Sequence, residues 1–285
     1  MAEDQTRAVL LTGANGGIGA ATARALADRG LTVFATVRDD RGSLPAMRGI
    51  QPVQMDVTDP ASVAAVAKQL DETLGDSGLR AVVNNAGVIV QGPLELMPPE
   101  ELRRQFEINT YGPTFVAQSF LPLIRRGRGR IVNVSAPSAW VPLPFVAPIG
   151  ASKAALESIS TALRTELAAW RIPVVLIEPG ASRTAIFDKA AAAARAALHD
   201  VEPARAQLYA RQLAAIAKAG QRQRLNDPEK AANAIVKAVL ARRPKRWYAA
   251  SADVRLFRLA SHLPAGAREA LVARMLGLRG IPVQI

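Results

Sequence analysis

A glycine-rich stretch near the amino terminus has the residue types and spacing needed to hold a diphosphate. Thr12-Gly13-Ala14-Asn15-Gly16-Gly17-Ile18-Gly19 follows the apolar run 8–11 and precedes a helical pattern that ends near Arg29. Glycines let the backbone turn tightly and approach a pyrophosphate, whose charge the free N–H groups at the start of a helix stabilise. The order strand, glycine turn, helix therefore predicts a dinucleotide site. A glycine turn without a ligand is the alternative.

Arg38 directly follows the second apolar run, 32–37. In a dinucleotide fold this position faces the adenosine ribose, where an acidic residue suits a free 2′-hydroxyl and an arginine suits a 2′-phosphate. Arg38, with Arg41 as a candidate helper, therefore favours NADP(H) over NAD(H). We expect Asp39 and Asp40 to come too late in the chain and to face solvent. A surface arginine without a ligand is the alternative for Arg38.

Short apolar runs alternate with helical patterns along the whole chain. The expected strands are 8–11, 32–37, 51–55, 80–83, 130–134, 173–177 and 247–250. Such alternation is typical of parallel strands joined by right-handed helical crossovers. We therefore predict an α/β fold: a three-layer, Rossmann-type, doubly wound sheet of about seven mostly parallel strands.

No second domain is indicated, so residues 1–285 are predicted to form a single domain. The alanine-rich, helical segment 185–224 lies beyond the sixth expected strand and is predicted to be a substrate lid. A plain pair of connecting helices is the alternative for this segment. Two amphipathic helices are expected to finish the chain.

Composition excludes several classes of protein. The chain has no cysteine and only two histidines, far apart, so we expect neither disulfides nor a metal site. A net charge of +12 raises nucleic acid and anionic membranes as partners. The densest basic clusters, 125–130 and 242–246, however, come where a helix is expected to end, and cations there favourably face the helix dipole. We therefore expect no nucleic-acid and no membrane partner. The absence of a signal-peptide pattern and of a long apolar run predicts a cytoplasmic protein.

Seven motifs, in this order, resemble those of the short-chain dehydrogenase/reductase family over nearly the whole chain. They are 12–19, Asp56-Val57, Asn84-Asn85-Ala86-Gly87, Asn109 within 108–112, Ile131-Val132-Asn133-Val134-Ser135, Ala151-Ser152-Lys153-Ala154-Ala155, and Glu178-Pro179-Gly180 with Thr184. The resemblance implies a Rossmann-type fold and an oxidoreductase that uses a nicotinamide dinucleotide. It also implies a homodimer or homotetramer that pairs through the helices near 111–126 and 150–170.

The resemblance assigns roles to residues at matching positions. Asn109 and Lys153 match two of the four catalytic positions of the family, and Lys153 would also hold the nicotinamide ribose. The implied cofactor-binding residues are Gly13, Asn15, Gly17, Ile18, Gly19, Arg38, Asp56, Val57, Asn85, Ala86, Gly87, Lys153, Pro179, Gly180 and Thr184.

The other two catalytic positions depart from the family pattern. The family's proton-transferring tyrosine lies four residues before the lysine, where this chain has Ile149. Its serine lies thirteen residues earlier still, where this chain has Ala136, next to Ser135. The loss of a positioned acid typically costs about 10²–10⁴-fold in rate. An ordinary carbonyl reduction is therefore not the expected reaction.

Three hypotheses about function follow. The first is hydride transfer to a bulky apolar substrate that does not need the tyrosine, such as an iminium ion, or an enone protonated by water or by a lid residue such as Tyr209. The second is a non-redox enzyme, a cyclase, dehydratase or isomerase, that keeps the dinucleotide as a scaffold. The third is a catalytically inactive dinucleotide-binding partner protein. We favour the first.

The proline-rich loop 136–148 is unusually apolar, and prolines restrict its conformations. It is predicted to form a rigid wall for an apolar small-molecule substrate, with packing of the loop against the core as the alternative. The predicted substrate-pocket residues are Ser138, Trp140, Phe145, Ile149 and Tyr209. Glu178 is expected to be structural.

Overall fold

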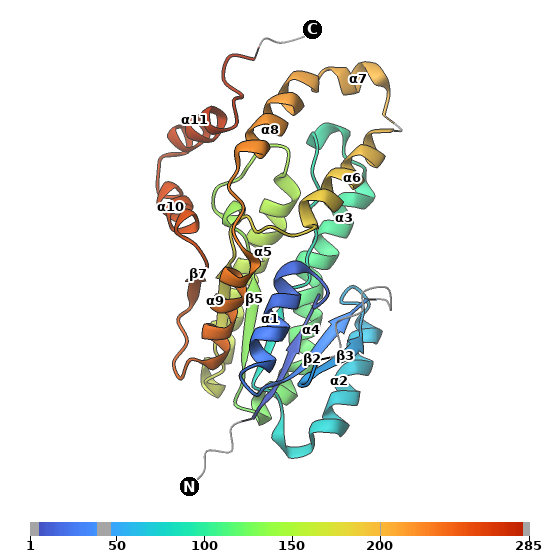
Figure 1. The fold of residues 1–285 in the computed structure, drawn as a ribbon, viewed down its shortest axis with the longest axis vertical. Helices are drawn as coiled ribbons and strands as arrows, with labels where there is room; N and C mark the ends of the chain where they lie inside the picture. Colours follow the sequence, from blue (N-terminus) through green and yellow to red (C-terminus); the bar gives the residue numbers. More distant parts are fainter. Residues whose placement is uncertain (1–5, 39–46, 200, 282–285) are drawn as a thin grey trace.

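The computed structural model describes residues 6–38, 47–199 and 201–281 (Figure 1). Its centre is a seven-stranded sheet with the order β3-β2-β1-β4-β5-β6-β7, in which every neighbouring pair is parallel. The strands are β1 (Ala8–Leu11), β2 (Thr32–Val37), β3 (Ile50–Gln54), β4 (Ala81–Asn84), β5 (Arg130–Val134), β6 (Val174–Glu178) and β7 (Trp247–Ala249). The predicted doubly wound sheet is confirmed, with all seven strands parallel and with bounds within one residue of those expected.

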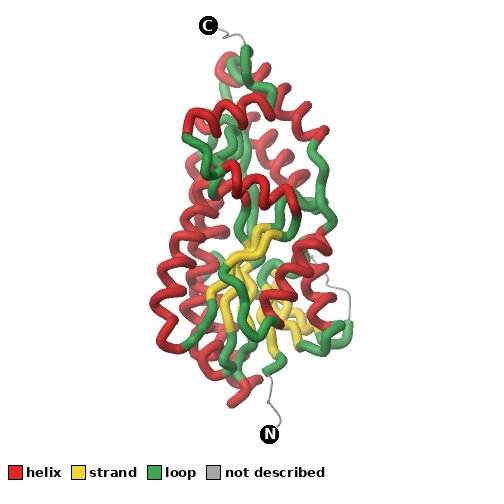
Figure 2. Tube along the Cα trace, turned by 90° about the vertical axis from the view of Figure 1, so that its left-hand side faces the viewer, coloured by secondary structure: helices red, strands yellow, loops and turns green. Residues whose placement is uncertain are grey.

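Helices cover both faces of the sheet (Figure 2). They are α1 (Gly17–Ala27), α2 (Pro60–Leu74), α3 (Pro99–Phe106), α4 (Gly112–Arg126), α5 (Ala147–Glu166), α6 (Ile186–His199), α7 (Pro203–Gln207), α8 (Ala210–Arg222), α9 (Pro228–Leu240), α10 (Ala252–Ala260) and α11 (Ala265–Met275). The described residues of the segment 185–224 are therefore mostly helical, as expected, and α6, α7 and α8 lie beyond the carboxyl ends of the strands (Figure 1). None of the helices described is long and apolar enough to span a membrane.

Two hydrophobic clusters form the core, one on each face of the sheet. Alternate residues of β1 point to opposite clusters, because successive side chains of a strand face opposite sides. Leu10 packs with α2 and α4 in one cluster, and Leu11 packs with α1 and α9 in the other. Strand β1 is thus buried on both faces, as its continuous apolar sequence predicts, whereas the edge strands β3 and β7 are only partly buried.

A buried polar network ties the carboxyl ends of two central strands to α5. The Asn84 side chain on β4 donates a hydrogen bond to Asn133 on β5, at 2.8 Å. Asn133 donates in turn to the hydroxyl of Ser160 on α5, also at 2.8 Å, and Ser160 donates to the Leu156 carbonyl. Since buried amides need partners, this chain of bonds fixes α5, and therefore Lys153, against the sheet.

The join between α3 and α4 is a π-helical turn, Glu107–Tyr111, that contains Asn109. The sequence predicts a helix-compatible join here. The extra residue that a π-turn inserts changes the direction of the side chains around it, and such turns are frequent at functional sites.

Candidate cofactor and catalytic site

The glycine turn leaves a bare backbone surface at the start of α1. A Cβ atom at Gly19 would lie 2.1 Å from the Gly13 carbonyl oxygen, and one at Gly17 would lie 2.4 Å from Thr184 Cγ2. Gly13 itself has a φ of 63°, and a Cβ there would lie 2.8 Å from Ala86 Cα. These positions therefore require glycine. The turn brings Ala86 and Thr184, far away in sequence, to the same place, as a diphosphate cradle at a helix N-terminus needs.

Asn85 holds the shape of this turn. Its side-chain nitrogen donates to the carbonyl oxygens of Thr12 and Gly13, both at 3.0 Å. The hydroxyl of Thr12 in turn accepts hydrogen bonds from the backbone N–H groups of Asn85 and Ala86. The loop after β4 is thus bonded to the loop after β1, so the two cannot move independently.

The residues predicted for the adenosine end follow β2 and β3. Arg38 is exposed directly after β2, and its carbonyl accepts a hydrogen bond from Gln54 at 3.4 Å. The Asp56 carboxylate after β3 accepts from both the N–H and the hydroxyl of Thr58. Val57 packs against Gly112, where a Cβ would lie 3.0 Å from Val57 Cγ2. Arg41, Asp39 and Asp40 lie outside the described residues.

After β6, Gly180 turns with a φ of 68°, and a Cβ there would lie 3.0 Å from the Ser251 hydroxyl. Pro179 and Gly180 therefore lie at the same edge of the sheet as the glycine turn, because parallel strands end at one edge. The side chain of Ile18 packs against the hydrophobic cluster shared by α1 and α9, and Asn15 is exposed.

Lys153 and Asn109 converge on Gly87. A Cβ at Gly87 would lie 3.3 Å from Asn109 Oδ1 and 3.8 Å from Lys153 Nζ. Asn109 is buried, accepts a hydrogen bond from the N–H of Val88 and donates one to its carbonyl. Lys153 donates to the Val134 carbonyl at 2.7 Å. Burial lowers the pKa of Lys153 to about 8, against the opposing effect of the Glu157 charge.

No phenol lies beside Lys153. Ile149 is in the first turn of α5 and its carbonyl accepts from the Ser152 hydroxyl, while Ala136 follows β5. All three tyrosines of the chain are within the described residues and are held elsewhere. Tyr111 is half exposed beside Phe115, Tyr248 accepts from the N–H of Lys245, and Tyr209 donates to Glu95. A shifted alignment therefore does not restore the missing residue.

The predicted substrate-pocket residues separate into two groups. Phe145, with a φ of 65°, meets Tyr209, which lies between α7 and α8, edge to face at a centroid distance of 6.3 Å, and its carbonyl accepts a hydrogen bond from the N–H of Gly92. Ser138 is buried, and a Cβ atom at Gly150 would lie 2.9 Å from the Ser138 carbonyl oxygen. Trp140 instead packs with Trp247, at a centroid distance of 6.2 Å. One part of loop 136–148 thus contacts the segment that joins α7 to α8, and another part packs against β7.

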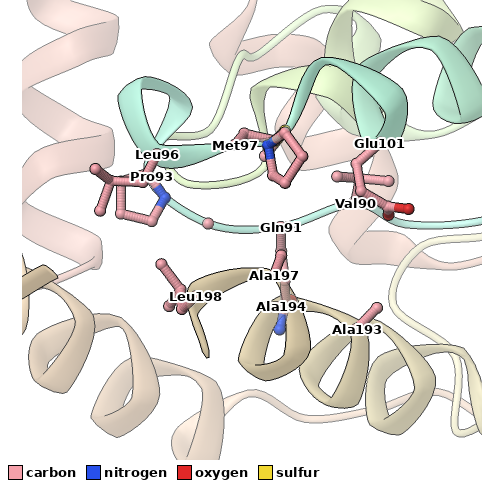
Figure 3. A pocket seen from close by; sticks show the side chains of 12 residues that line it. Val90, Gln91, Pro93, Leu96, Met97, Glu101, Ala193, Ala194, Ala197 and Leu198 are labelled. Atoms are coloured by element: carbon pink, nitrogen blue, oxygen red, sulfur yellow. The ribbon is translucent and has the colours of Figure 1, made fainter. Parts of the chain in front are cut away.

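A groove runs between the loop after β4 and α6, and none of the five predicted pocket residues lines it (Figure 3). Its inner part, of only about 20 Å³, is lined by Val90, Gln91, Gly92, Pro93, Leu96, Met97, Pro98, Glu101, Ala193, Ala194, Ala197 and Leu198. An outer part of about 410 Å³ extends to Arg205 of α7. This groove was not predicted from the sequence. The turn residues around Gly92-Pro93 and the alanine face of α6 are the features of the sequence that could have indicated it.

Residues of the segment 201–224 are bonded to the rim of this groove. Glu95 accepts hydrogen bonds from the Tyr209 hydroxyl at 2.6 Å and from Arg205 at 3.2 Å. The bond with Tyr209, and then that with Arg205, lowers the pKa of Glu95. The same bond raises the pKa of Tyr209, so this phenol is less acidic than usual in the observed arrangement.

A second buried cluster lies next to Lys153, and the sequence analysis did not find it. Arg258 of α10 lies between two indoles, with its guanidinium carbon 3.5 Å from the ring centroid of Trp140 and 4.2 Å from that of Trp247. Each indole N–H donates to a carboxylate, Trp140 to Glu157 and Trp247 to Glu178. The cluster therefore joins α10 and β7 to the loop that carries Ser138 and to α5.

Burial has the largest effect on the pKa of both carboxylates, Glu157 and Glu178. It raises the pKa of Glu178 to about 7, and the nearby charge of Glu157 raises it further, whereas the Trp247 hydrogen bond and the Arg258 charge lower it. Burial also raises the pKa of Glu157, against hydrogen bonds from Ser135 and Trp140. Glu178 is thus partly protonated near neutral pH, and its contacts agree with the structural role expected for it.

Comparison with known proteins identifies the family. The family model described as short chain dehydrogenase matches residues 7–195. Estradiol 17-beta-dehydrogenase 2 from Rattus norvegicus is 41% identical over 189 residues, which are 63% of this chain and 49% of the rat protein. This chain thus spans about half the length of that relative. The 3-amino-tetrahydro-pyrrolizinone reductase from Xenorhabdus hominickii is 32% identical over 215 residues, 75% of each chain.

Solved structures similar to this chain belong to the same family. A short-chain dehydrogenase from Streptomyces avermitilis has a TM-score of 0.74 at 28% identity and covers 99% of this chain and 100% of its own. A short chain dehydrogenase from Burkholderia cenocepacia, in complex with NADP, has a TM-score of 0.72 at 26% identity and covers 95% and 98%. The chain belongs to the short-chain dehydrogenase/reductase family of oxidoreductases and has its dinucleotide-binding fold.

The first prediction concerns the glycine turn. Gly19→Ala places a Cβ 2.1 Å from a backbone oxygen, so the turn must deform, and we expect a loss of NADPH affinity of at least about tenfold, since a backbone shift disturbs several charge-assisted hydrogen bonds. Gly16→Ala is the matched control, because its Cβ would meet only the Gly13 oxygen at 3.5 Å. Isothermal titration calorimetry measures both variants. Equal affinities would contradict the prediction.

The second prediction concerns Glu178. Because its pKa is raised on folding, the stability that it contributes is fully present below the unfolded pKa and is lost as the pH rises through about 7. Glu178→Gln keeps an acceptor for Trp247 but cannot ionise. We compare the free energy of unfolding of this variant with that of the wild type. We expect the difference to grow in favour of the variant by about 1–2 kcal/mol as the pH rises from about 5 to about 8, measured by urea unfolding.

Glu157→Gln is the comparison for this test. Both carboxylate oxygens of Glu157 accept hydrogen bonds, from Ser135 and from Trp140, and an amide leaves one of these donors unpaired. We therefore expect Glu157→Gln to be less stable than the wild type at each pH. A Glu178→Gln variant with an unchanged pH dependence of unfolding would contradict the assigned pKa.

Proposed function

We propose that this protein binds NADP(H) and transfers hydride to a bulky apolar substrate whose reacting carbon does not need the family's tyrosine acid. The observation that carries the proposal is the contrast around α5. Lys153, Asn109 and Gly87 converge as a dinucleotide site requires, while Ile149 and Ala136 leave no hydroxyl at the two positions that serve a developing alkoxide.

The residues present fit a dinucleotide. The glycine turn offers a bare helix start for a diphosphate, and the buried ammonium of Lys153 is placed to donate hydrogen bonds to ribose hydroxyls. The bound dinucleotide supplies the hydride. Asn109 fixes the backbone of Val88 and so the loop after β4. Ile149 contributes an apolar surface in place of an acid.

An apolar residue in this position restricts the substrate. A ketone that gains hydride becomes an alkoxide and needs a proton or hydrogen bonds at its oxygen. An iminium carbon is already cationic and becomes a neutral amine without protonation. An enone accepts hydride at carbon and can take its proton from water or from a lid residue such as Tyr209. Both classes therefore suit a site without the tyrosine.

The relatives support reduction with NADP(H). One is named 3-amino-tetrahydro-pyrrolizinone reductase. Another, from Ornithobacterium rhinotracheale, is named NADPH-dependent 3-dehydrocapnine reductase and is 33% identical over 193 residues, 65% of this chain and 68% of its own. The estradiol dehydrogenase relative supports a bulky apolar substrate.

The test is turnover of the cofactor. The purified protein with NADPH is given panels of cyclic iminium ions and cyclic enones, and product is followed by mass spectrometry together with the absorbance of reduced nicotinamide. We expect product and NADPH consumption in equal amounts. Product without NADPH consumption would refute the proposal and favour a cyclase, dehydratase or isomerase. Tight NADPH binding without any product would favour a dinucleotide-binding partner protein.

The third prediction concerns the missing acid. Ile149→Tyr combined with Ala136→Ser restores the family's two hydroxyls, and we expect reduction of a simple cyclic ketone to rise by about 10²–10⁴-fold. Ile149→Phe with Ala136→Ser is the matched control, since it adds the ring without the phenol. A gain in both variants, or in neither, would mean that the pocket rather than the proton donor determines the reaction.

The fourth prediction concerns the cofactor. Arg38→Gln removes the charge at the end of β2, and we expect NADPH affinity to fall by about 10–100-fold, as the loss of a charge-assisted hydrogen bond requires. NADH affinity should stay within about twofold, because NADH has no 2′-phosphate for an arginine to bind. Fluorescence titration measures both. Wild-type protein that prefers NADH would contradict this part of the proposal.

A further inference from the structure

The segments that precede the strands lie at the edge of the sheet opposite the dinucleotide turn, because all strands are parallel. Segments 125–130, 164–173 and 241–246 precede β5, β6 and β7, which are neighbours in the sheet. Adjacent strands are about 4.8 Å apart, so the amino ends of these three lie within roughly 10 Å. Figure 1 shows this end near the amino terminus, at the opposite end of the molecule from α7 and α8.

These three segments hold ten cations and one acidic residue, Glu166. We call the ten cations the amino-edge patch: Arg125, Arg126, Arg128, Arg130, Arg164, Arg171, Arg242, Arg243, Lys245 and Arg246. All except Arg130 and Arg164 are exposed. The net charge of +12 is therefore not evenly spread over the molecule.

Two members of the patch have structural roles at helix ends. Arg130 donates to the carbonyls of Ala238 and Ala241, at 2.7 and 2.6 Å, where α9 ends. Arg164 donates to the Val174 carbonyl at 2.9 Å. Among the exposed members, Arg126 is ion-paired with Asp71 of α2. These contacts account for the two buried cations and for Arg126, but not for the other seven exposed ones.

The cations also repel one another. Burial, and then the charge of Arg246, lowers the pKa of Arg164. Burial, and then the charge of Arg80, lowers the pKa of Arg130 to about 10. A surface that gathers like charges gains most from a ligand that carries several negative charges.

We infer that the amino-edge patch binds the phosphate backbone of a nucleic acid. Nine of the ten cations are arginine, whose planar fork matches a phosphate and holds it with two hydrogen bonds. A strand presents phosphates in series, and each one neutralised releases counterions. Trp170 is 56% exposed beside Arg125, whose guanidinium carbon lies 4.6 Å from the ring centroid. It offers an aromatic surface on which a base can stack.

A lipid surface fits the patch less well. Membrane-surface binding combines charge with apolar side chains that insert between lipids. In the three segments Trp170 is the one large apolar side chain that is exposed, since Leu167 and Ile172 are buried. The expectation of no nucleic-acid partner considered each basic cluster separately, as the end of one helix. Their position at one edge of the sheet is what favours a shared polyanion.

The test is fluorescence anisotropy with a labelled oligothymidylate of about 20 nucleotides, long enough for several phosphate contacts. Each titration is made without NADP⁺ and again with saturating NADP⁺, which blocks the dinucleotide site. The key variant carries Arg242→Gln, Arg243→Gln and Lys245→Gln, all exposed in the loop before β7. We expect binding to weaken by at least about tenfold, and the slope of log K against log salt to fall by about 2 when three phosphate contacts are lost.

The matched control removes the same charge from the opposite end of the molecule. Arg211→Gln, Lys218→Gln and Arg222→Gln are exposed on α8. We expect this control to bind within about twofold of the wild type, because salt screens distant charges. Thermal melting of both triple variants verifies that they fold.

Four results would overturn the inference. Equal weakening in both variants would mean that only net charge matters. Binding that NADP⁺ abolishes would place the oligonucleotide in the dinucleotide site. Tighter binding to vesicles rich in phosphatidylserine would point to a membrane, and displacement by polyglutamate at lower charge concentration would point to an acidic protein. None of these results bears on hydride transfer, which has its own assay.

Discussion

All seven strands run in one direction, and this constraint organises the molecule. Every loop that follows a strand lies at one edge of the sheet, and every segment that precedes a strand lies at the other. The first edge gathers the glycine turn, Asn85, Gly87 and Gly180 into a dinucleotide site. The second gathers arginines that the chain places before each of three neighbouring strands. The two ends of the molecule therefore have different chemistry from a single topological cause.

Lys153 depends on this arrangement most directly. Its ammonium is buried against the Val134 carbonyl, which by itself disfavours the charge and lowers the pKa to about 8. Lys153 is held in this position because the hydrogen bonds among Asn84, Asn133 and Ser160 fix α5 against the sheet. A buried charge of this kind is more often functional than structural. The hydride-transfer proposal keeps the cofactor because Lys153 is present, and it changes the substrate because residue 149, the predicted tyrosine position, is Ile.

The carboxyl-terminal part of the chain packs beside the site. Arg258 stacks on Trp140 and Trp247, and each indole is hydrogen-bonded to a carboxylate, that of the part-buried Glu157 or of the buried Glu178. The family match ends at residue 195, so Trp247 and Arg258 lie beyond it. Part of the loop that was expected to form a substrate wall is thus packed on these residues, while Phe145 contacts Tyr209. The apolar groove lies instead between the loop after β4 and α6.

The sequence by itself determined the fold class, the order of elements and the family, because these depend on local patterns: apolar runs, helix periodicity and glycines that a tight turn requires. It also shows Ile149 four residues before Lys153 and Ala136 thirteen residues before Ile149, and the loss of the family's two hydroxyls is a prediction from this spacing. Only the tertiary structure decided which side chains meet. The stacking of Arg258 on two tryptophans, the Glu95–Tyr209 contact and the amino-edge patch all join residues separated by long stretches of chain. Periodicity within one element carries no information about such contacts, because they depend on how the elements pack.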